Sequence, residues 1–269
     1  MNLNCSRRSF VSLALAGGVG TIFDSRLFAS AVGPAGDKTI LFGASAFALG
    51  VALAHPERTV IVERGIHLAP EFSQVGDWTD LGQPKTEEGR RLMAALAGAG
   101  LLKEGRLELP PLSDFLQTHL ASRGLSAFFN AELVGFAKGK ATVYGGGASG
   151  LTRVSVTRLL DTTSVGWKNR GLGDVDARTF SAITNRGLHT VRLAPDADFR
   201  AARIKLYDDF AANGKGAKIL AETNALGCVY RDPTRRIVRS FAADETWVPS
   251  AQFPTFMDAF EGGLAWNLA

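Results

Sequence analysis

The sequence is poor in the residues that build disulfides and metal sites. It has 2 cysteines and 4 histidines among 269 residues. Cys5 lies in an N-terminal segment that we expect to be removed, so Cys228 has no intramolecular partner and is interpreted as a small buried apolar residue. The histidines lack the i, i+4 spacing of a helical zinc site: His55, His67, His119 and His189. The pattern predicts neither a disulfide framework nor a metal centre.

Blocks of like charge and long apolar spans are also missing. The net charge of +4 is spread along the chain, which argues against a nucleic-acid-binding surface. Beyond the N-terminal segment, no apolar run reaches the ~20 residues that a membrane span needs. The sequence lacks the Tyr-x-x-x-Lys motif of short-chain dehydrogenases and the Gly-x-Ser-x-Gly motif of α/β-hydrolases. A hydrophobic share of 46% is ordinary for a globular core, and the length allows one large domain or a domain with an insertion.

The first 31 residues have the pattern of an export signal. Arg7 and Arg8 precede a mildly apolar stretch at residues 11–23, and Ala29-Ser30-Ala31 has the small-x-small pattern of a cleavage site. We therefore predict a twin-arginine signal peptide over residues 1–31 and a periplasmic mature protein. The alternative is a disordered basic N-terminus on a cytoplasmic protein. A membrane anchor is disfavoured because the apolar stretch is too short to span a bilayer.

The most informative segment is residues 39–65, TILFGASAFALGVALAHPERTVIVERG. An apolar run enters a turn of small residues at Gly43-Ala44-Ser45, a helix-like apolar stretch follows, and a second β-branched run ends at Glu63. Glu63 comes about 20 residues after Gly43, the spacing at which a dinucleotide-binding βαβ unit places a carboxylate on a ribose hydroxyl. The alternative for Glu63 is an ordinary solvated acid at a strand end.

The remaining sequence predicts a mixed α/β chain. Residues 66–85 predict a long loop that contains His67 and Trp78, either of which can line an active site or be structural. Helices are expected at residues 86–99, 111–123, 198–212 and 255–268, and strands at 126–129, 132–137, 141–144, 151–157, 189–193, 218–222 and 237–242. The glycine-rich stretch at residues 145–150 lacks the Lys-Ser/Thr ending of a phosphate loop, so we interpret it as a hairpin tip.

The order of these elements resembles the FAD-dependent oxidoreductases with a glutathione-reductase-type flavin fold. The phosphate turn at Gly43, the acid Glu63, the hairpins at residues 132–157 and the turn at residues 159–164 carry the resemblance, together with a closing motif at residues 241–245. The resemblance implies an FAD/NAD(P)-binding Rossmann-like domain with a parallel central sheet, an antiparallel three-stranded crossover and a small inserted region. We expect residues 38–165 and 236–269 to form the FAD-binding domain and residues 166–235 to form a substrate or cap region.

The resemblance also implies which residues bind FAD. The set is Gly43, Ser45, Ala48, Glu63, Arg64, Val134, Thr163 and Asp244. Glu63 would bind the ribose, Asp244 the ribityl chain or pyrophosphate, and the Ser45 hydroxyl would donate to a phosphate oxygen. The alternative for Asp244 is an ordinary loop acid, and the alternative for Arg64 is a surface charge. No catalytic residue is assigned, because the flavin carries the hydride chemistry in such enzymes.

These features lead to an expected function and an alternative. The expected protein is an exported FAD-dependent dehydrogenase that moves hydride from a small organic substrate to flavin and passes electrons to an acceptor or a partner subunit. The alternative is a non-catalytic accessory or scaffold subunit that keeps the fold. Ser45, Ser164 and Ala243 replace glycines of the family pattern, which favours the alternative, whereas Glu63 and Asp244 favour the enzyme.

Overall fold

The structure is a computed structural model that describes residues 38–73, 81–103, 106–107, 111–121, 123–137, 139–145, 150–223, 226–232 and 234–268. The predicted signal peptide, Trp78 and most of the glycine-rich hairpin tip lie outside these residues. In the described part of the chain, no helix is long and apolar enough to cross a membrane. The same part contains no group of three or more His, Cys, Asp or Glu side chains placed to hold a metal ion.

A 6-stranded sheet forms the centre of the molecule, in the order β14-β15-β9-β1-β2-β5. Its strands are β1 (Thr39–Phe42), β2 (Thr59–Val62), β5 (Ala127–Phe128), β9 (Arg158–Asp161), β14 (Arg239–Ala242) and β15 (Glu245–Trp247). All neighbours are parallel except β14, which is antiparallel to β15. Every residue of β1 and β2 is buried, which explains their continuous apolar sequences, because a parallel sheet is covered on both faces.

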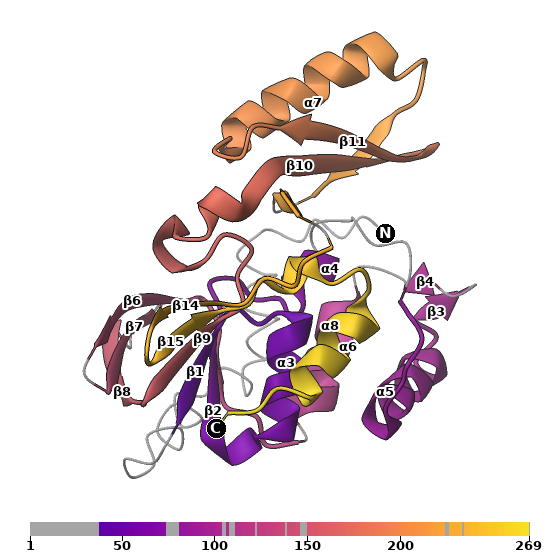
Figure 1. Ribbon diagram of the computed structural model, residues 1–269. Helices are drawn as coiled ribbons and strands as arrows, with labels where there is room; N and C mark the ends of the chain where they lie inside the picture. Colours follow the sequence, from indigo (N-terminus) through magenta and orange to yellow (C-terminus); the bar gives the residue numbers. More distant parts are fainter. Residues whose placement is uncertain are drawn as a thin grey trace, which may run out of the picture.

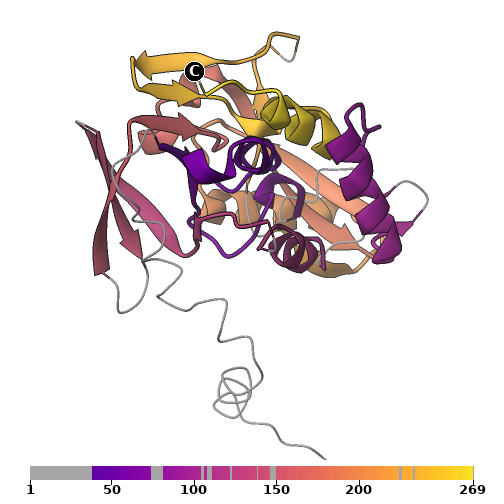
Figure 2. The same cartoon turned by 90° about the horizontal axis from the view of Figure 1, so that it is seen from below.

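Different layers cover the two faces of this sheet (Figure 1). Leu41 and Ile61 pack against a helical layer, whereas Ile40 and Val60 pack against a three-stranded antiparallel sheet. The helical layer contains α3 (Ala46–Ala54), α5 (Glu87–Gly98), α6 (Pro111–Ala121) and α8 (Phe256–Leu264), and the small sheet contains β6 (Ala131–Ala137), β7 (Lys140–Gly145) and β8 (Gly150–Ser155). Figure 2 shows the small sheet and α5 at opposite sides, with α3 and α8 between them. Alternate side chains therefore fill separate cores.

Helices α3 and α8 cross in direct backbone contact. A Cβ atom on Gly50 would overlap the carbonyl oxygen of Phe260, and one on Gly263 would overlap the carbonyl oxygen of Phe47. The two glycines thus let α8, which is near the C-terminus, pack against the helix that follows the first turn. Residues between β15 and α8 are consequently held beside the beginning of α3.

A second antiparallel sheet lies above the central domain in Figure 1. It is built around β10 (Val175–Thr184), which pairs with β11 (Gly187–Leu193), β12 (Ile219–Glu222) and β13 (Gly227–Tyr230). Helix α7 (Phe199–Asn213) covers this sheet and buries Ala202 and Leu206 against Phe180. The remaining elements are short: α4 (Pro70–Ser73), β3 (Leu102–Lys103), β4 (Arg106–Leu107), η2 (Pro56–Arg58), η3 (Trp167–Asn169), η4 (Leu172–Asp174) and η5 (Ser250–Gln252).

The predicted fold class is confirmed, with local differences. The antiparallel crossover and the strand–helix–strand order of residues 189–222 are present, but β10, β13 and β15 were not predicted. The last helix was expected to reach residue 268 and ends at Leu264. The chain beyond it turns back to the sheet, where the carbonyl of Leu268 accepts hydrogen bonds from Arg58 and Arg158 at 3.2 and 3.0 Å.

Candidate functional site

The first βα turn is built around Gly43. Its φ of +93° lies in the region that favours glycine, and its amide donates to the carbonyl of Val62 at 2.9 Å. A Cβ at this position would lie 3.0 Å from both Thr162 Oγ1 and Thr163 Cγ2. Gly43 therefore allows the turn to approach the loop after β9, so the ends of β1 and β9 form one compact edge.

Ser45 begins α3 as an ordinary N-cap residue. Its Oγ accepts a hydrogen bond from the amide of Ala48 at 3.1 Å and donates to Thr162 Oγ1 at 2.8 Å. Ser45 was predicted to donate to a phosphate oxygen, but in this arrangement its hydroxyl is hydrogen-bonded within the protein. The single hydroxyl proton is directed to Thr162, and Ala48 contributes its amide to the cap.

Glu63 lies at the end of β2 and faces the turn. The residue is 8% exposed, and its carboxylate oxygens accept hydrogen bonds from the amides of Ala44 and Gly65, each at 2.7 Å. Burial raises the pKa of Glu63, against the opposite effects of the two amides and of the charges on Arg64 and His67. A carboxylate has about four lone-pair positions, so each oxygen keeps capacity for a ribose hydroxyl.

A second carboxylate, which the sequence analysis did not single out, lies at the N-terminus of α3. Glu71 Oε1 accepts hydrogen bonds from the amide of Ala46 at 2.8 Å and from the hydroxyl of Ser250 at 2.5 Å. Glu71 Oε2 is buried and has no hydrogen-bond partner among the residues that the structure describes. Burial raises the pKa of Glu71 to about 7. The same Ser250 Oγ accepts the amide of Phe47 at 3.3 Å.

The chain itself therefore pairs the amides of this turn. The amides of Ala44, Ala46, Phe47 and Ala48 donate to side chains of Glu63, Glu71, Ser250 and Ser45, respectively. In a dinucleotide-binding unit, amides at this helix N-terminus face the pyrophosphate. In this protein, the side chain of Glu71 lies at that place.

Of three other predicted residues, only Thr163 lies against the turn, whereas Arg64 and Val134 have other surroundings. Thr163 lies against Gly43, but its amide and hydroxyl both donate to Asp161 Oδ1, at 2.9 and 2.7 Å. Arg64 follows Glu63 and makes a two-point ion pair with Glu132 of β6, at 2.5 and 2.7 Å. Val134 is 46% exposed on β6, where the pairing with β7 shifts register.

Asp244 lies at the wrong edge of the sheet for its predicted role, which is a correction to the sequence interpretation. It precedes β15, and its carbonyl accepts the amide of Leu159 at 2.8 Å. Because β15 is parallel to β9 and β9 to β1, the start of β15 lies at the opposite edge from Gly43. The residues after β15 reach the turn, where Ser250 accepts the Phe47 amide and Phe253 stacks on the Phe47 ring of α3.

His67 and Cys228 have modest roles. His67 is partly buried and lies close enough to Glu63 to lower that residue's pKa by its charge. Cys228 is partly buried, and burial raises the pKa of its thiol to about 11, so the thiol stays protonated at neutral pH.

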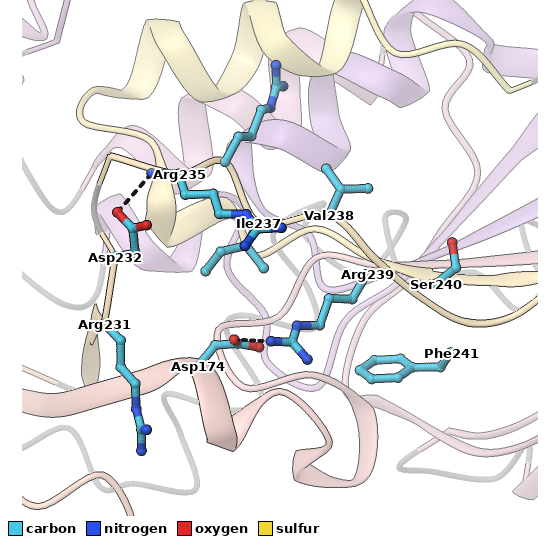
Figure 3. Close-up of a pocket in the computed structure, with 10 residues that line it drawn as sticks. Asp174, Arg231, Asp232, Arg235, Ile237, Val238, Arg239, Ser240 and Phe241 are labelled. Atoms are coloured by element: carbon cyan, nitrogen blue, oxygen red, sulfur yellow. Dashed lines mark hydrogen bonds and ion pairs between the residues drawn. The ribbon is translucent and has the colours of Figure 1, made fainter.

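An arginine-lined groove adjoins the turn through η5. Its volume is about 570 Å³, and its charged lining residues are Asp174, Arg231, Asp232, Arg235, Arg236 and Arg239 (Figure 3). Arg239 pairs with Asp174 across the groove. Ile237 exchanges hydrogen bonds of 2.5 and 3.0 Å with the Gln252 side chain, which joins the groove to η5. The excess of arginine gives the groove a positive charge suited to anions.

Comparisons with known proteins identify the fold. The sequence matches no protein-family model and no curated protein. Among solved structures, a glycerol-3-phosphate dehydrogenase from Bacillus halodurans, complexed with FAD, is similar with a TM-score of 0.57 and 9% identity, over 89% of this chain and 66% of that chain. A glycine oxidase from Geobacillus kaustophilus is similar with a TM-score of 0.52 and 10% identity, over 84% of this chain and 92% of that chain.

A third similar structure is BexE, described in connection with oxidation during BE-7585A biosynthesis. It has a TM-score of 0.50 and 13% identity, and the match covers 85% of this chain and 60% of that chain. This chain thus spans only about 60% of the BexE length. At these identities the likeness establishes architecture alone. Together with the parallel sheet and the first βα turn, it shows that the chain has an FAD/NAD(P)-binding Rossmann-like fold.

Proposed function

We propose that this protein is an exported FAD-dependent oxidoreductase that takes hydride from a small organic anion. The first βα turn carries the proposal: Gly43 at positive φ, α3 starting beside it, and Glu63 facing the turn from the neighbouring strand. That combination is the physical requirement for a dinucleotide, namely close backbone approach, a helix N-terminus and a ribose acceptor. The similar dehydrogenase from Bacillus halodurans was solved with FAD, which supports FAD as the dinucleotide.

The turn offers such a ligand hydrogen-bond donors at a helix N-terminus. Glu71 Oε1 accepts the Ala46 amide, so an acidic oxygen can be placed against the first amides of α3. Glu63 would accept the ribose hydroxyls, and the amides of α3 would hold the pyrophosphate. FAD would supply the hydride acceptor. The protein's contribution is to bind and orient both reactants.

The arginine-lined groove supports the substrate class. Arg231 and Arg235 lie on the segment that connects β13 to β14. Hydrogen bonds between Ile237 and Gln252 join the groove to η5. An organic acid would be held there by charge-assisted hydrogen bonds from guanidinium groups. Electrons would leave to an acceptor or partner subunit, and the export pattern at residues 1–31 would place the reaction in the periplasm.

The visible absorption spectrum of the exported protein, purified from a flavin-replete host, tests the cofactor directly. We expect flavin absorption bands that remain after gel filtration, and FAD in the supernatant after denaturation. Bleaching by a carboxylic acid substrate under anaerobic conditions would support the hydride step. A colourless protein that also fails to take up added FAD would contradict the proposal.

One observation favours a second candidate, the non-catalytic accessory or scaffold subunit. The amides that a pyrophosphate would use already donate to side chains of the chain itself. A protein that had lost the dinucleotide would gain stability from such pairing, because buried donors without acceptors are costly. Under this candidate, the colourless protein would keep its fold and bind a partner protein instead.

A further inference from the structure

The segment after β2 is anchored so that it delivers Glu71 to the turn. The amide of Ala69 donates to the carbonyl of Ala44 at 2.7 Å, and the amide of Leu68 donates to Ser113 Oγ at 3.0 Å. Leu68 and Ala69 are 3% and 0% exposed, respectively. Ala69 has a φ of +48°, an unfavourable conformation for a residue with a Cβ. The position of Glu71 is therefore set by specific packing of this segment.

The contacts of Glu71 are those expected of a bound anion. One oxygen accepts a helix N-terminal amide and a serine hydroxyl, while the other is buried with no partner in the described part of the chain. A phosphate at a helix N-terminus would use the same amide and would also carry negative charge. The Glu71 carboxyl and a phosphate cannot both take the acceptor position beside the Ala46 amide, and the ionised form of Glu71 would also repel the phosphate.

We propose that Glu71 is an internal competitor for the pyrophosphate of a dinucleotide, and that its carboxylate must leave the N-terminus of α3 before a dinucleotide binds. The inference rests on the proposed dinucleotide site. Within that site, Glu71 would control the affinity for the dinucleotide. Ser250 takes part in the exchange, because its hydroxyl donates to Glu71 and accepts from the Phe47 amide at the same time. Displacement frees the Ala46 amide and the Ser250 hydroxyl for the ligand.

The test compares Glu71→Ala and Glu71→Gln with the unmodified mature protein. Affinity for FAD, ADP and riboflavin is measured by calorimetry on flavin-free protein. We expect Glu71→Ala to raise affinity for FAD and ADP at least about tenfold, because it removes the side chain that occupies the phosphate place. Glu71→Gln keeps an acceptor for the Ala46 amide, so it should fold in any case and give a smaller increase. Riboflavin, which lacks phosphate, should show no change.

Glu261 provides a matched control. Glu261 is buried, and its Oε1 accepts the amides of Lys85 and Thr86 at the start of α5. Like Glu71 Oε2, its Oε2 has no partner among the described residues. Glu261→Ala and Glu71→Ala should both lower the melting temperature of the flavin-free protein. Only Glu71→Ala should raise affinity for FAD and ADP. Opposite effects on stability and affinity are the signature of a competitor.

The outcomes separate the competitor from the proposed function. Tight FAD binding by the unmodified protein with no gain in either Glu71 variant overturns the competitor and keeps the function. Binding of FAD or ADP only after substitution supports the competitor and overturns flavin use by the natural chain. No binding of FAD or ADP by any variant overturns both. An equal gain from Glu261→Ala also overturns the competitor, since the effect would then be general loosening.

Discussion

Ser250 and Glu71 meet at the N-terminus of α3, with the serine hydroxyl donating to the carboxylate over 2.5 Å. They are separated by 179 positions in the sequence, and each also binds an amide of the helix. This pair closes the first βα turn with groups from the chain itself. It therefore decides whether the turn is open to a ligand.

Ser250→Ala should destabilise the flavin-free protein by about 1–3 kcal/mol. The change leaves the buried Phe47 amide without an acceptor and removes a donor from Glu71, and unpaired buried groups are costly. Urea denaturation followed by circular dichroism measures the effect. Ser155→Ala, at an exposed position of β8, is the control and should change little. Equal stabilities for the two variants would contradict the described contacts.

Gly50→Ala should lower the free energy of unfolding by at least about 2 kcal/mol. The new methyl group would overlap the carbonyl of Phe260 and force α3 and α8 apart. Gly98→Ala is the matched control, because no atom lies within 4 Å of a Cβ at that helical position. We expect that control to be neutral or to gain roughly 0.5–1 kcal/mol. Thermal or urea unfolding distinguishes the two, and a tolerated Gly50→Ala would rule out the close helix crossing.

The stability difference between the natural protein and Glu71→Gln should depend on pH. Burial raises the pKa of Glu71 from 4.5 to about 7, so the folded state holds this proton more tightly than the unfolded state. The contribution of the Glu71 carboxyl to the free energy of unfolding is complete below about pH 4.5. It is lost as pH rises through about 7, with a total change of about 3 kcal/mol.

Nearby groups titrate in both proteins and cancel in this difference to first order. Burial also raises the pKa of Glu63, whose charge adds to the increase for Glu71. Unfolding free energies at several pH values between 4 and 8 check the prediction. A difference that is constant over this range would show that Glu71 is not buried at the turn.

Glu63→Gln should weaken FAD binding by about one to two decades. A carboxylate forms charge-assisted hydrogen bonds to ribose hydroxyls, and the amide loses both the charge and one acceptor. Flavin fluorescence titration of the flavin-free protein measures the change, with riboflavin binding unaffected. Glu132→Gln, which alters an exposed acid beside Arg64, is the control. If Glu63→Gln binds FAD as well as the natural protein, the ribose is not held by this residue.

Replacing Arg7 and Arg8 together by lysine should leave the precursor in the cytoplasm. The twin-arginine pathway requires the guanidinium pair, which lysine does not reproduce although it keeps the charge. Fractionation and immunoblotting of the two precursors provide the measurement. Arg26→Lys, in the same predicted signal, is the control and should be exported normally. Periplasmic accumulation of the double variant would exclude this export route.

Local sequence patterns were sufficient for the elements whose physics is local. The apolar runs TILF and TVIV, the positive-φ glycine at Gly43 and the acid at Glu63 lie within one βαβ unit. Their order and spacing predicted the turn and its facing carboxylate. The helices expected at residues 86–99, 198–212 and 255–268 also begin where they were predicted: Thr86, Asp198 and Thr255 each accept a backbone amide from the first helical turn.

Only the tertiary structure decided what fills the turn. Asp244 was assigned to the cofactor because residues 241–245 resemble the closing motif of the family. The structure shows β15, a strand that was not predicted, and its direction places the acid at the far edge. Ser250 and Glu71 had no motif to mark them, because their roles depend on the α3–α8 crossing and on the packed segment at Ala69. Sequence patterns determine where a helix N-terminus forms, whereas the acceptor that reaches it depends on contacts between distant parts of the chain.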